Sequence, residues 1–118
     1  MQKVNVLGTK YDIILETLEQ NKAFKDCDGY CDPSVKKLYI RLYTEEECKL
    51  DDFGYESAET IRKRVIRHEI LHAFMYESGL WRNSFCADMP WAMSEEMVDW
   101  FAIQSPKIFA EFKELGLL

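Results

Sequence analysis

All the imidazole in this chain lies within five residues. His68 and His72 are the only two histidines among 118 residues, and they stand in the sequence His68-Glu69-Ile70-Leu71-His72. Residues i and i+4 of an α-helix share one face, so a helix at this place presents both imidazoles to the same point. Any chemistry of this chain that needs imidazole therefore takes place here.

The residues around the histidine pair have a helical pattern. Ser57 is a good N-terminal cap, and Gly79 stands where glycine is favoured just after a helix end. The second half of the stretch is apolar on nearly all sides, which is typical of a buried helix. We therefore expect a buried helix over about residues 57–78, packed under a sheet.

The residues before this helix favour strands, and those after it favour more helices. The best strand signal is the period-two alternation of residues 36–43, and a hairpin is expected earlier, around Gly8. Helices are predicted over residues 94–103 and 106–115, separated at Ser105-Pro106. This order predicts an α+β fold. We expect one domain over residues 1–118, with an antiparallel or mixed N-terminal sheet whose edge strand lies near 36–43.

Charge and hydropathy limit the possible partners. The formal net charge is −6, which disfavours nucleic acids and anionic lipids as main partners. No stretch approaches the ~20 consecutive apolar residues of a membrane helix, and the N-terminus lacks the apolar run of a signal peptide. We expect a cytoplasmic protein, a monomer or small homo-oligomer, whose four cysteines are thiols rather than disulfides.

The spacing of the histidines has a chemical explanation. Two imidazoles on one helix face can bind one Zn²⁺, and the glutamate after the first histidine reaches a metal-bound water rather than the metal. Glu69 is the only charged residue between Arg67 and Glu77. A buried carboxylate without a partner is costly, and a zinc-bound water accounts for its presence. The structural alternative is an ion pair with Arg82 or a nearby lysine.

The residues that flank the motif strengthen this interpretation. Apolar Val65 stands three residues before His68, and apolar Phe74 stands two after His72, with uncharged residues at the inner positions. In these flanks the sequence resembles the zincin metallopeptidases. The resemblance implies a zinc cofactor and hydrolysis of peptide bonds with Glu69 as general base. It also implies a peptide or protein substrate bound along an edge strand.

A third zinc ligand must come from elsewhere in the chain. The metzincin pattern needs glycine at position 75 and histidine at 78, where this chain has Met75 and Ser78. Glu95 and Asp99 stand four apart in a predicted helix and so share a face, and this arrangement resembles the gluzincins. That resemblance implies that Glu95 is the third ligand and that Asp99 supports a ligating histidine.

Other residues remain open for these roles. Glu96 is the alternative third ligand, and since neighbours on a helix point about 100° apart, only one of the two glutamates can face the zinc. Cys86 and Asp88 are further candidates. With both histidines used as ligands, a tyrosine or an arginine must stabilise the oxyanion. The tyrosine candidates are Tyr30, Tyr39, Tyr55 and Tyr76.

The size of the chain narrows the resemblance. It is similar to the minimal gluzincins and to short zincin-like proteins carried by prophages of Gram-positive bacteria, and more loosely to the ImmA/IrrE-type metallopeptidases. The leading hypothesis is a zinc-dependent metallopeptidase. The alternative is a zincin-fold binding or regulatory protein of phage or prophage origin that keeps the metal but cleaves nothing, because 118 residues leave little chain for substrate pockets.

Overall fold

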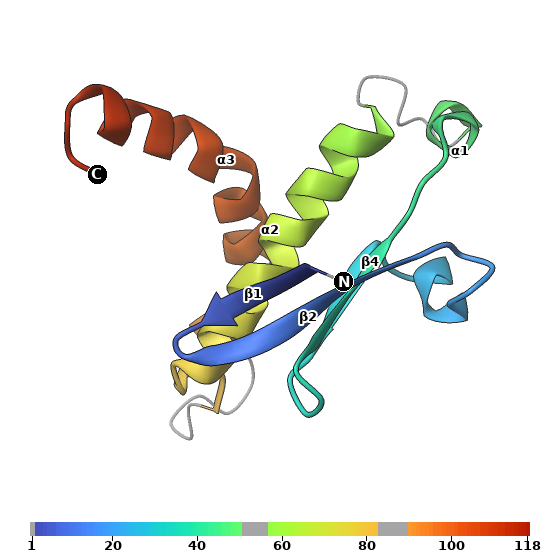
Figure 1. Cartoon of the computed structure of the whole chain (residues 1–118), viewed down its shortest axis with the longest axis horizontal. Helices are drawn as coiled ribbons and strands as arrows, with labels where there is room; N and C mark the ends of the chain where they lie inside the picture. Colours follow the sequence, from blue (N-terminus) through green and yellow to red (C-terminus); the bar gives the residue numbers. More distant parts are fainter. Residues whose placement is uncertain (1, 51–56, 83–89) are drawn as a thin grey trace.

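The N-terminal part of the chain forms a four-stranded mixed sheet (Figure 1). The computed structural model describes residues 2–50, 57–82 and 90–118. Its strands are β1 (Gln2–Val6), β2 (Thr9–Glu16), β3 (Gly29–Asp32) and β4 (Lys37–Arg41). The spatial order is β1-β2-β4-β3; β2 and β4 run parallel, and the two outer pairs are antiparallel. Helices follow the sheet, which confirms the predicted α+β class.

The first two strands form the expected hairpin. Leu7 and Gly8 both have positive φ, at 50° and 92°, as a two-residue type I′ turn requires. The Gly8 amide donates to Asn5 Oδ1 at 2.8 Å, which closes the turn. The strong right-handed twist of such a turn matches that of the strands it joins.

The prediction that the strand near 36–43 lies at the edge of the sheet is wrong. β4 is an interior strand with β2 on one side and β3 on the other. Leu38 and Ile40 are fully buried, so the apolar alternation indicates that one face of this strand packs in the core. Alternation carries no information about whether both edges of a strand are paired. The outer strands of the sheet are β1 and the short strand β3, and β3 lies against α2.

Two long helices follow the sheet, α2 (Ala58–Glu77) and α3 (Glu95–Glu114). The shorter helices are α1 (Glu45–Leu50), η1 (Lys22–Lys25), η2 (Leu80–Arg82) and η3 (Trp91–Met93). Ser57 caps α2 by accepting from the Thr60 amide at 3.2 Å, and Gly79 follows with a φ of 86°. The expected helix over 57–78 is therefore confirmed. No helix in the described ranges is both long and apolar enough to cross a membrane.

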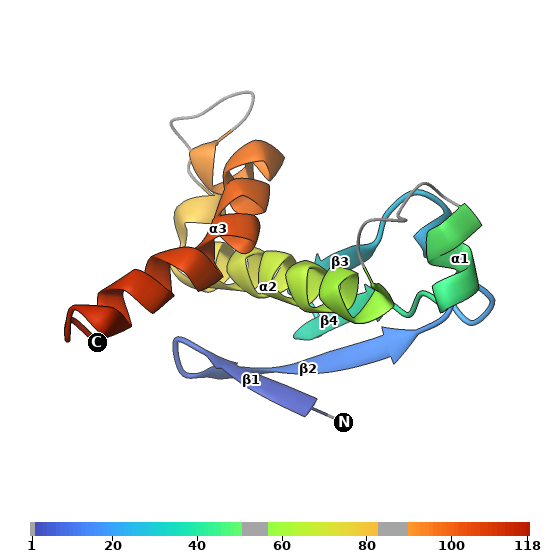
Figure 2. The same ribbon diagram turned by 90° about the horizontal axis from the view of Figure 1, so that it is seen from above.

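The core lies between one face of the sheet and α2. From the sheet it contains Val6, Tyr11, Ile13, Leu38 and Ile40, and from α2 it contains Ile61, Val65 and Ala73. Burial of a large apolar side chain stabilises a fold by about 1.5–3 kcal/mol. Figure 2 shows α2 between the sheet and the first part of α3. The helix with the two histidines is thus anchored by the core along its length.

The prediction of two separate C-terminal helices is also wrong, because α3 continues through Pro106. Proline lacks an N–H and so leaves the carbonyl four residues earlier without its helical donor. That carbonyl belongs to Ala102, and it accepts a hydrogen bond from Arg67 Nε at 2.7 Å. With its carbonyl satisfied from outside, the helix bends rather than ends, and Figure 1 shows the change of direction within α3.

Candidate metal centre

One cavity of about 660 Å³ opens where β3, α2 and the start of α3 meet. The face of α2 toward this cavity carries His68, Glu69 and His72. Glu95 and Asp99 of α3 line it from the other side. The fold therefore brings the motif on one helix and the two predicted acidic residues on the other to the same space.

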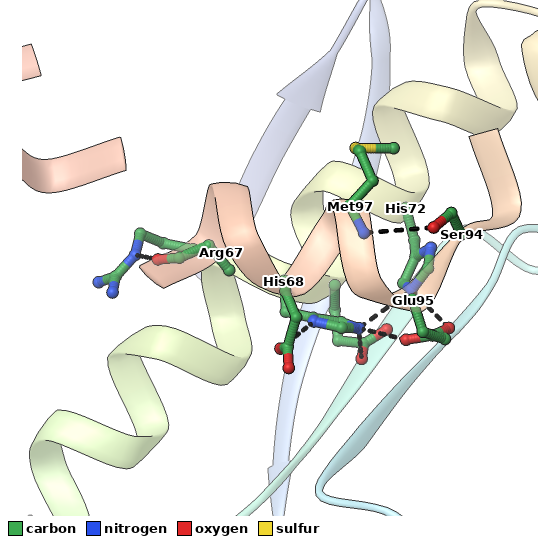
Figure 3. A network of polar contacts seen from close by, with 9 residues as sticks. Arg67, His68, His72, Ser94, Glu95 and Met97 are labelled. Carbon is green, nitrogen blue, oxygen red and sulfur yellow. Dashed lines mark hydrogen bonds and ion pairs between the residues drawn. The ribbon is translucent and has the colours of Figure 1, made fainter. Parts of the chain in front are cut away.

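The carboxylate of Glu95 touches both histidines. Its Oε2 lies 2.9 Å from His68 Nε2, and its Oε1 lies 3.0 Å from His72 Nε2. The two Nε2 atoms are themselves 3.1 Å apart. Figure 3 shows Glu95 against both imidazole rings, with dashed lines to each. Three potential ligand side chains from two helices therefore converge.

The local sequence explains why Glu95 is at this place. The hydroxyl of Ser94 accepts from the Met97 amide at 3.2 Å and so fixes the start of α3 just before Glu95. Acidic side chains are favoured in the first turn of a helix, which suits Glu95 and Glu96 alike. Their directions differ, and Glu96 is exposed and lies outside the lining of the cavity.

Asp99 contacts the other nitrogen of His68. Its Oδ1 lies 3.0 Å from His68 Nδ1, one turn along α3 from Glu95. A carboxylate at this nitrogen can accept its proton, which would leave Nε2 unprotonated for a metal in the cavity. The contact therefore fixes both the tautomer and the orientation of the His68 ring.

Glu69 is the buried acid of the site. Its side chain is only 6% exposed, and its Oε1 lies 3.8 Å from His68 Nε2. Burial, with the charge of Glu95 as a second cause, raises the pKa of Glu69 to about 8. No basic side chain that the structure describes forms an ion pair with Glu69; the side chain of Arg82, the predicted alternative partner, lies outside the described part.

The backbone of β3 lies close to this glutamate at Gly29. A Cβ atom added at Gly29 would lie 3.2 Å from Glu69 Cγ, 2.8 Å from Val65 Cγ1 and 2.9 Å from the Tyr39 carbonyl oxygen. Only glycine lets the edge strand approach α2 this closely. β3 therefore forms a wall of the cavity directly beside Glu69.

The geometry of the three convergent side chains fits a zinc ion. Ligand atoms about 2.0–2.1 Å from one tetrahedral Zn²⁺ lie about 3.3 Å from one another. The two Nε2 atoms are 3.1 Å apart, and each lies 2.9–3.0 Å from a different oxygen of Glu95. Burial lowers the pKa of His72, which favours the neutral imidazole that binds metals. One side-chain donor atom each of His68, Glu69 and His72 also lies within 4.8 Å of the other two, so Glu69 is beside the histidine pair.

Several other predicted candidates lie elsewhere. Cys86, Asp88 and Tyr55 are outside the described residues. Tyr39 stacks on Tyr30, with ring centroids 4.7 Å apart, and Tyr30 is the only tyrosine among the described residues that line the cavity. The hydroxyl of Tyr30 accepts from Asn21 Nδ2 at 2.8 Å. Tyr76 packs its ring against Trp81 instead.

Two features of the site have no clear signal in the sequence. Trp81 packs against the ring of His72, with centroids 5.9 Å apart, and forms part of the cavity wall. Cys27 and Cys31 also line the cavity. Burial raises the pKa of the Cys31 thiol to about 12 and that of Cys27 in the same direction. Burial therefore disfavours the thiolate form of both cysteines in the metal-free protein.

The second nitrogen of His72 differs from that of His68. His72 Nδ1 is buried and has no hydrogen-bond partner within the described ranges. Among the described residues, only His68 thus has a carboxylate at its Nδ1. The orientation of His72 depends on packing against Trp81 instead.

In comparisons with known proteins, no family model, no curated protein sequence and no solved structure matches this chain. The resemblance to the gluzincins therefore depends on the motif residues themselves. The roles that it implies for zinc and for peptide hydrolysis stay predictions, supported by the distances above.

Proposed function

We propose that the protein is a zinc-dependent metallopeptidase in which His68, His72 and Glu95 hold the metal. The observation that carries this proposal is the position of Glu95. One of its carboxylate oxygens lies 2.9 Å from His68 Nε2, and the other lies 3.0 Å from His72 Nε2. A distance of 23 positions separates His72 from Glu95 in the chain. A His₂Glu zinc site requires a carboxylate beside the histidine pair, and here the fold brings one from a distant part of the sequence.

This donor set suits catalysis better than a purely structural site. Structural zinc sites have four protein ligands, whereas catalytic ones have three and leave one position for water or substrate. The three side chains here border an open cavity of about 660 Å³. Zinc held here by His68, His72 and Glu95 would supply a Lewis acid to activate water and polarise the carbonyl of a scissile bond.

Glu69 is the general base of the proposed reaction. It lies beside His68, at 3.8 Å from Nε2, so a water molecule bound to a metal held by Nε2 would lie within reach of its carboxylate. Burial favours the protonated acid in the metal-free protein, and a bound cation would favour the carboxylate. That carboxylate would accept a proton from the attacking water and deliver it to the leaving amine. Asp99 assists by holding the ring of His68 through Nδ1.

The edge strand β3 offers a place for an extended peptide. β3 pairs with β4 on one side only, and residues 27–31 line the cavity along its length. A peptide that adds to this edge forms backbone hydrogen bonds as a fifth strand and passes the zinc ligands. We therefore propose β3, rather than residues 36–43, as the strand along which a substrate binds. A peptide or protein is therefore the proposed partner, while the net charge of −6 disfavours nucleic acid.

The cysteines favour a reducing compartment. Cys27, Cys31 and Cys48 form no disulfide in the described part of the chain, as is usual for cytoplasmic proteins. We accordingly place the protein in the cytoplasm, as a monomer or small homo-oligomer.

A second candidate function is a zincin-fold binding or regulatory protein of phage or prophage origin that does not cleave its partner. One observation favours it: the described cavity lining offers few groups for an oxyanion. Tyr30 is the only tyrosine there; its hydroxyl accepts from Asn21 Nδ2 and keeps its own O–H as a donor. Arg64 is the only basic residue of that lining.

Glu69→Gln separates the two functions. The variant keeps the shape of the side chain and the three ligands, so it binds zinc like the wild type. Loss of a general base lowers the rate of cleavage by about 10²–10⁴-fold, measured on an unstructured protein such as casein with zinc present. Glu96→Gln, a change at an exposed neighbour, leaves the rate unchanged. A wild type that binds zinc and cleaves no more than Glu69→Gln supports the binding protein and contradicts the peptidase.

A further inference from the structure

The bend in α3 leaves one backbone carbonyl to be satisfied from another helix. Pro106 has no N–H, so the Ala102 carbonyl lacks its donor four residues on. Arg67 Nε fills that position at 2.7 Å, and Figure 3 shows Arg67 reaching across from its helix. Arg67 directly precedes His68, so this hydrogen bond joins α3 to α2 next to the first histidine.

Arg67 is not the solvated side chain that its sequence position suggests. It is half-buried, and burial lowers the pKa of its guanidinium. A hydrogen bond from a charged donor is about twice as strong as a neutral one, which offsets this desolvation. The contact is thus specific, and it joins the two helices that carry the candidate ligands.

The acceptor on α3 lies on the same face as the acidic residues. Ala102 follows Glu95 by seven positions and Asp99 by three, which is the spacing of one helical face. A shift of α3 by one residue rotates that face by about 100° and turns Glu96 toward the histidines in place of Glu95. A contact that fixes the rotation of α3 against α2 therefore also selects the ligand.

We propose that Arg67 and Pro106 form a positioning clamp, which sets the rotation of α3 against α2 so that Glu95 and Asp99 meet the two histidines. Pro106 makes the Ala102 carbonyl available, and Arg67 binds it. Arg67 is a positioning residue, since it touches neither the cavity ligands nor substrate. This inference rests on the proposed function for its metal, but the hydrogen bond itself can be tested without zinc.

A matched pair of variants isolates the hydrogen bond. Glutamine places a nitrogen donor at the same number of bonds from Cα as Arg67 Nε, whereas methionine has the same length and no donor. We expect Arg67→Met to lose at least about tenfold in Zn²⁺ affinity, measured by competition with a chelator. Arg67→Gln stays close to the wild type, with far-UV circular dichroism showing that both variants fold. Equal affinities in the two variants, whether both normal or both reduced, overturn the clamp.

Pro106→Ala distinguishes positioning from simple stability. It gives the Ala102 carbonyl a helical N–H, so in this background Arg67→Met no longer leaves a buried acceptor unsatisfied. We expect Arg67→Met alone to lower the Tm of the metal-free protein by about 4–8 °C relative to Arg67→Gln, and Pro106→Ala to remove most of that difference. The zinc affinity of the double variant stays low. Recovery of zinc affinity together with Tm shows that Arg67 only satisfies a carbonyl and overturns its positioning role.

The zinc-free measurement also separates the two proposals. If the wild type binds no zinc, the proposed function fails, and the clamp is judged by the Tm values of the metal-free variants. A lower Tm for Arg67→Met than for Arg67→Gln then supports the inter-helix contact. Identical Tm values overturn it.

Discussion

The two helices that supply the candidate ligands are held in different ways. α2 lies against the core, and the side chain of His72 is only 9% exposed. The first turn of α3 lies at the surface, where the side chain of Glu95 is 71% exposed although it contacts both histidines. One half of the site is thus part of the core, while the other half is brought to it by a few specific contacts. Stability and metal binding therefore depend on different residues.

Truncation of a core residue tests this contrast most strongly. Leu38→Ala removes a fully buried side chain beneath α2 and is expected to lower the free energy of unfolding by about 2–5 kcal/mol. Phe112→Ala, in the last turns of α3 where the side chain is 40% exposed, is expected to change it by about 0.5 kcal/mol or less. Urea unfolding of the two variants measures both values. If Phe112→Ala lowers the free energy of unfolding as much as Leu38→Ala, the end of α3 contributes to stability like the core, and the contrast is wrong.

Asp99 separates metal binding from stability on α3. Asp99→Ala removes the carboxylate that orients His68 through Nδ1, and loss of such an outer contact weakens metal affinity by about 10–100-fold. Because the side chain is 61% exposed, the free energy of unfolding of the metal-free protein changes little. Isothermal titration with Zn²⁺ measures the affinity. A variant with unchanged affinity excludes Asp99 from the support of the metal.

The smallest effect is expected where α2 ends against the sheet. Glu77 accepts hydrogen bonds from Lys36 Nζ and from the Tyr11 hydroxyl, both at 2.7 Å, and these contacts lower its pKa. A depressed carboxyl pKa stabilises the folded state above the ordinary carboxyl pKa, and this contribution disappears as the pH falls through the depressed value.

Glu77→Gln should therefore flatten the acid side of the stability profile below about pH 5, measured by thermal unfolding at a series of pH values. Glu59→Gln is the control, because Glu59 is paired only with Lys63 at the surface. If the two variants respond alike, the interior contacts of Glu77 add nothing to its ion pair.

The parts of the fold that sequence predicts well are those set by local chemistry. Ser57 and Gly79 mark the ends of α2 because a cap and a positive φ each depend on one residue and its neighbours. The apolar alternation of residues 36–43 likewise predicted a strand, which the structure has at Lys37–Arg41. Its place inside the sheet depends on pairing with β2 and β3, and no local pattern contains that information.

Contacts between distant residues account for what the sequence could not give. Pro106 ends a helix by local rules, yet α3 continues because Arg67 of another helix satisfies the Ala102 carbonyl. The choice between Glu95 and Glu96 likewise depends on the rotation of α3 against α2. The four-residue spacing from Glu95 to Asp99 was the one local signal for that choice, and the structure places both residues against His68.

The central claim is that Glu95 completes a metal site with the two histidines. It is tested most directly by the zinc content of Glu95→Ala and Glu96→Ala after purification with Zn²⁺ and extensive dialysis. The wild type and Glu96→Ala are predicted to retain about one zinc ion per chain, and Glu95→Ala is predicted to lose it while remaining folded. Retention of zinc by Glu95→Ala, or its loss from Glu96→Ala alone, contradicts the claim.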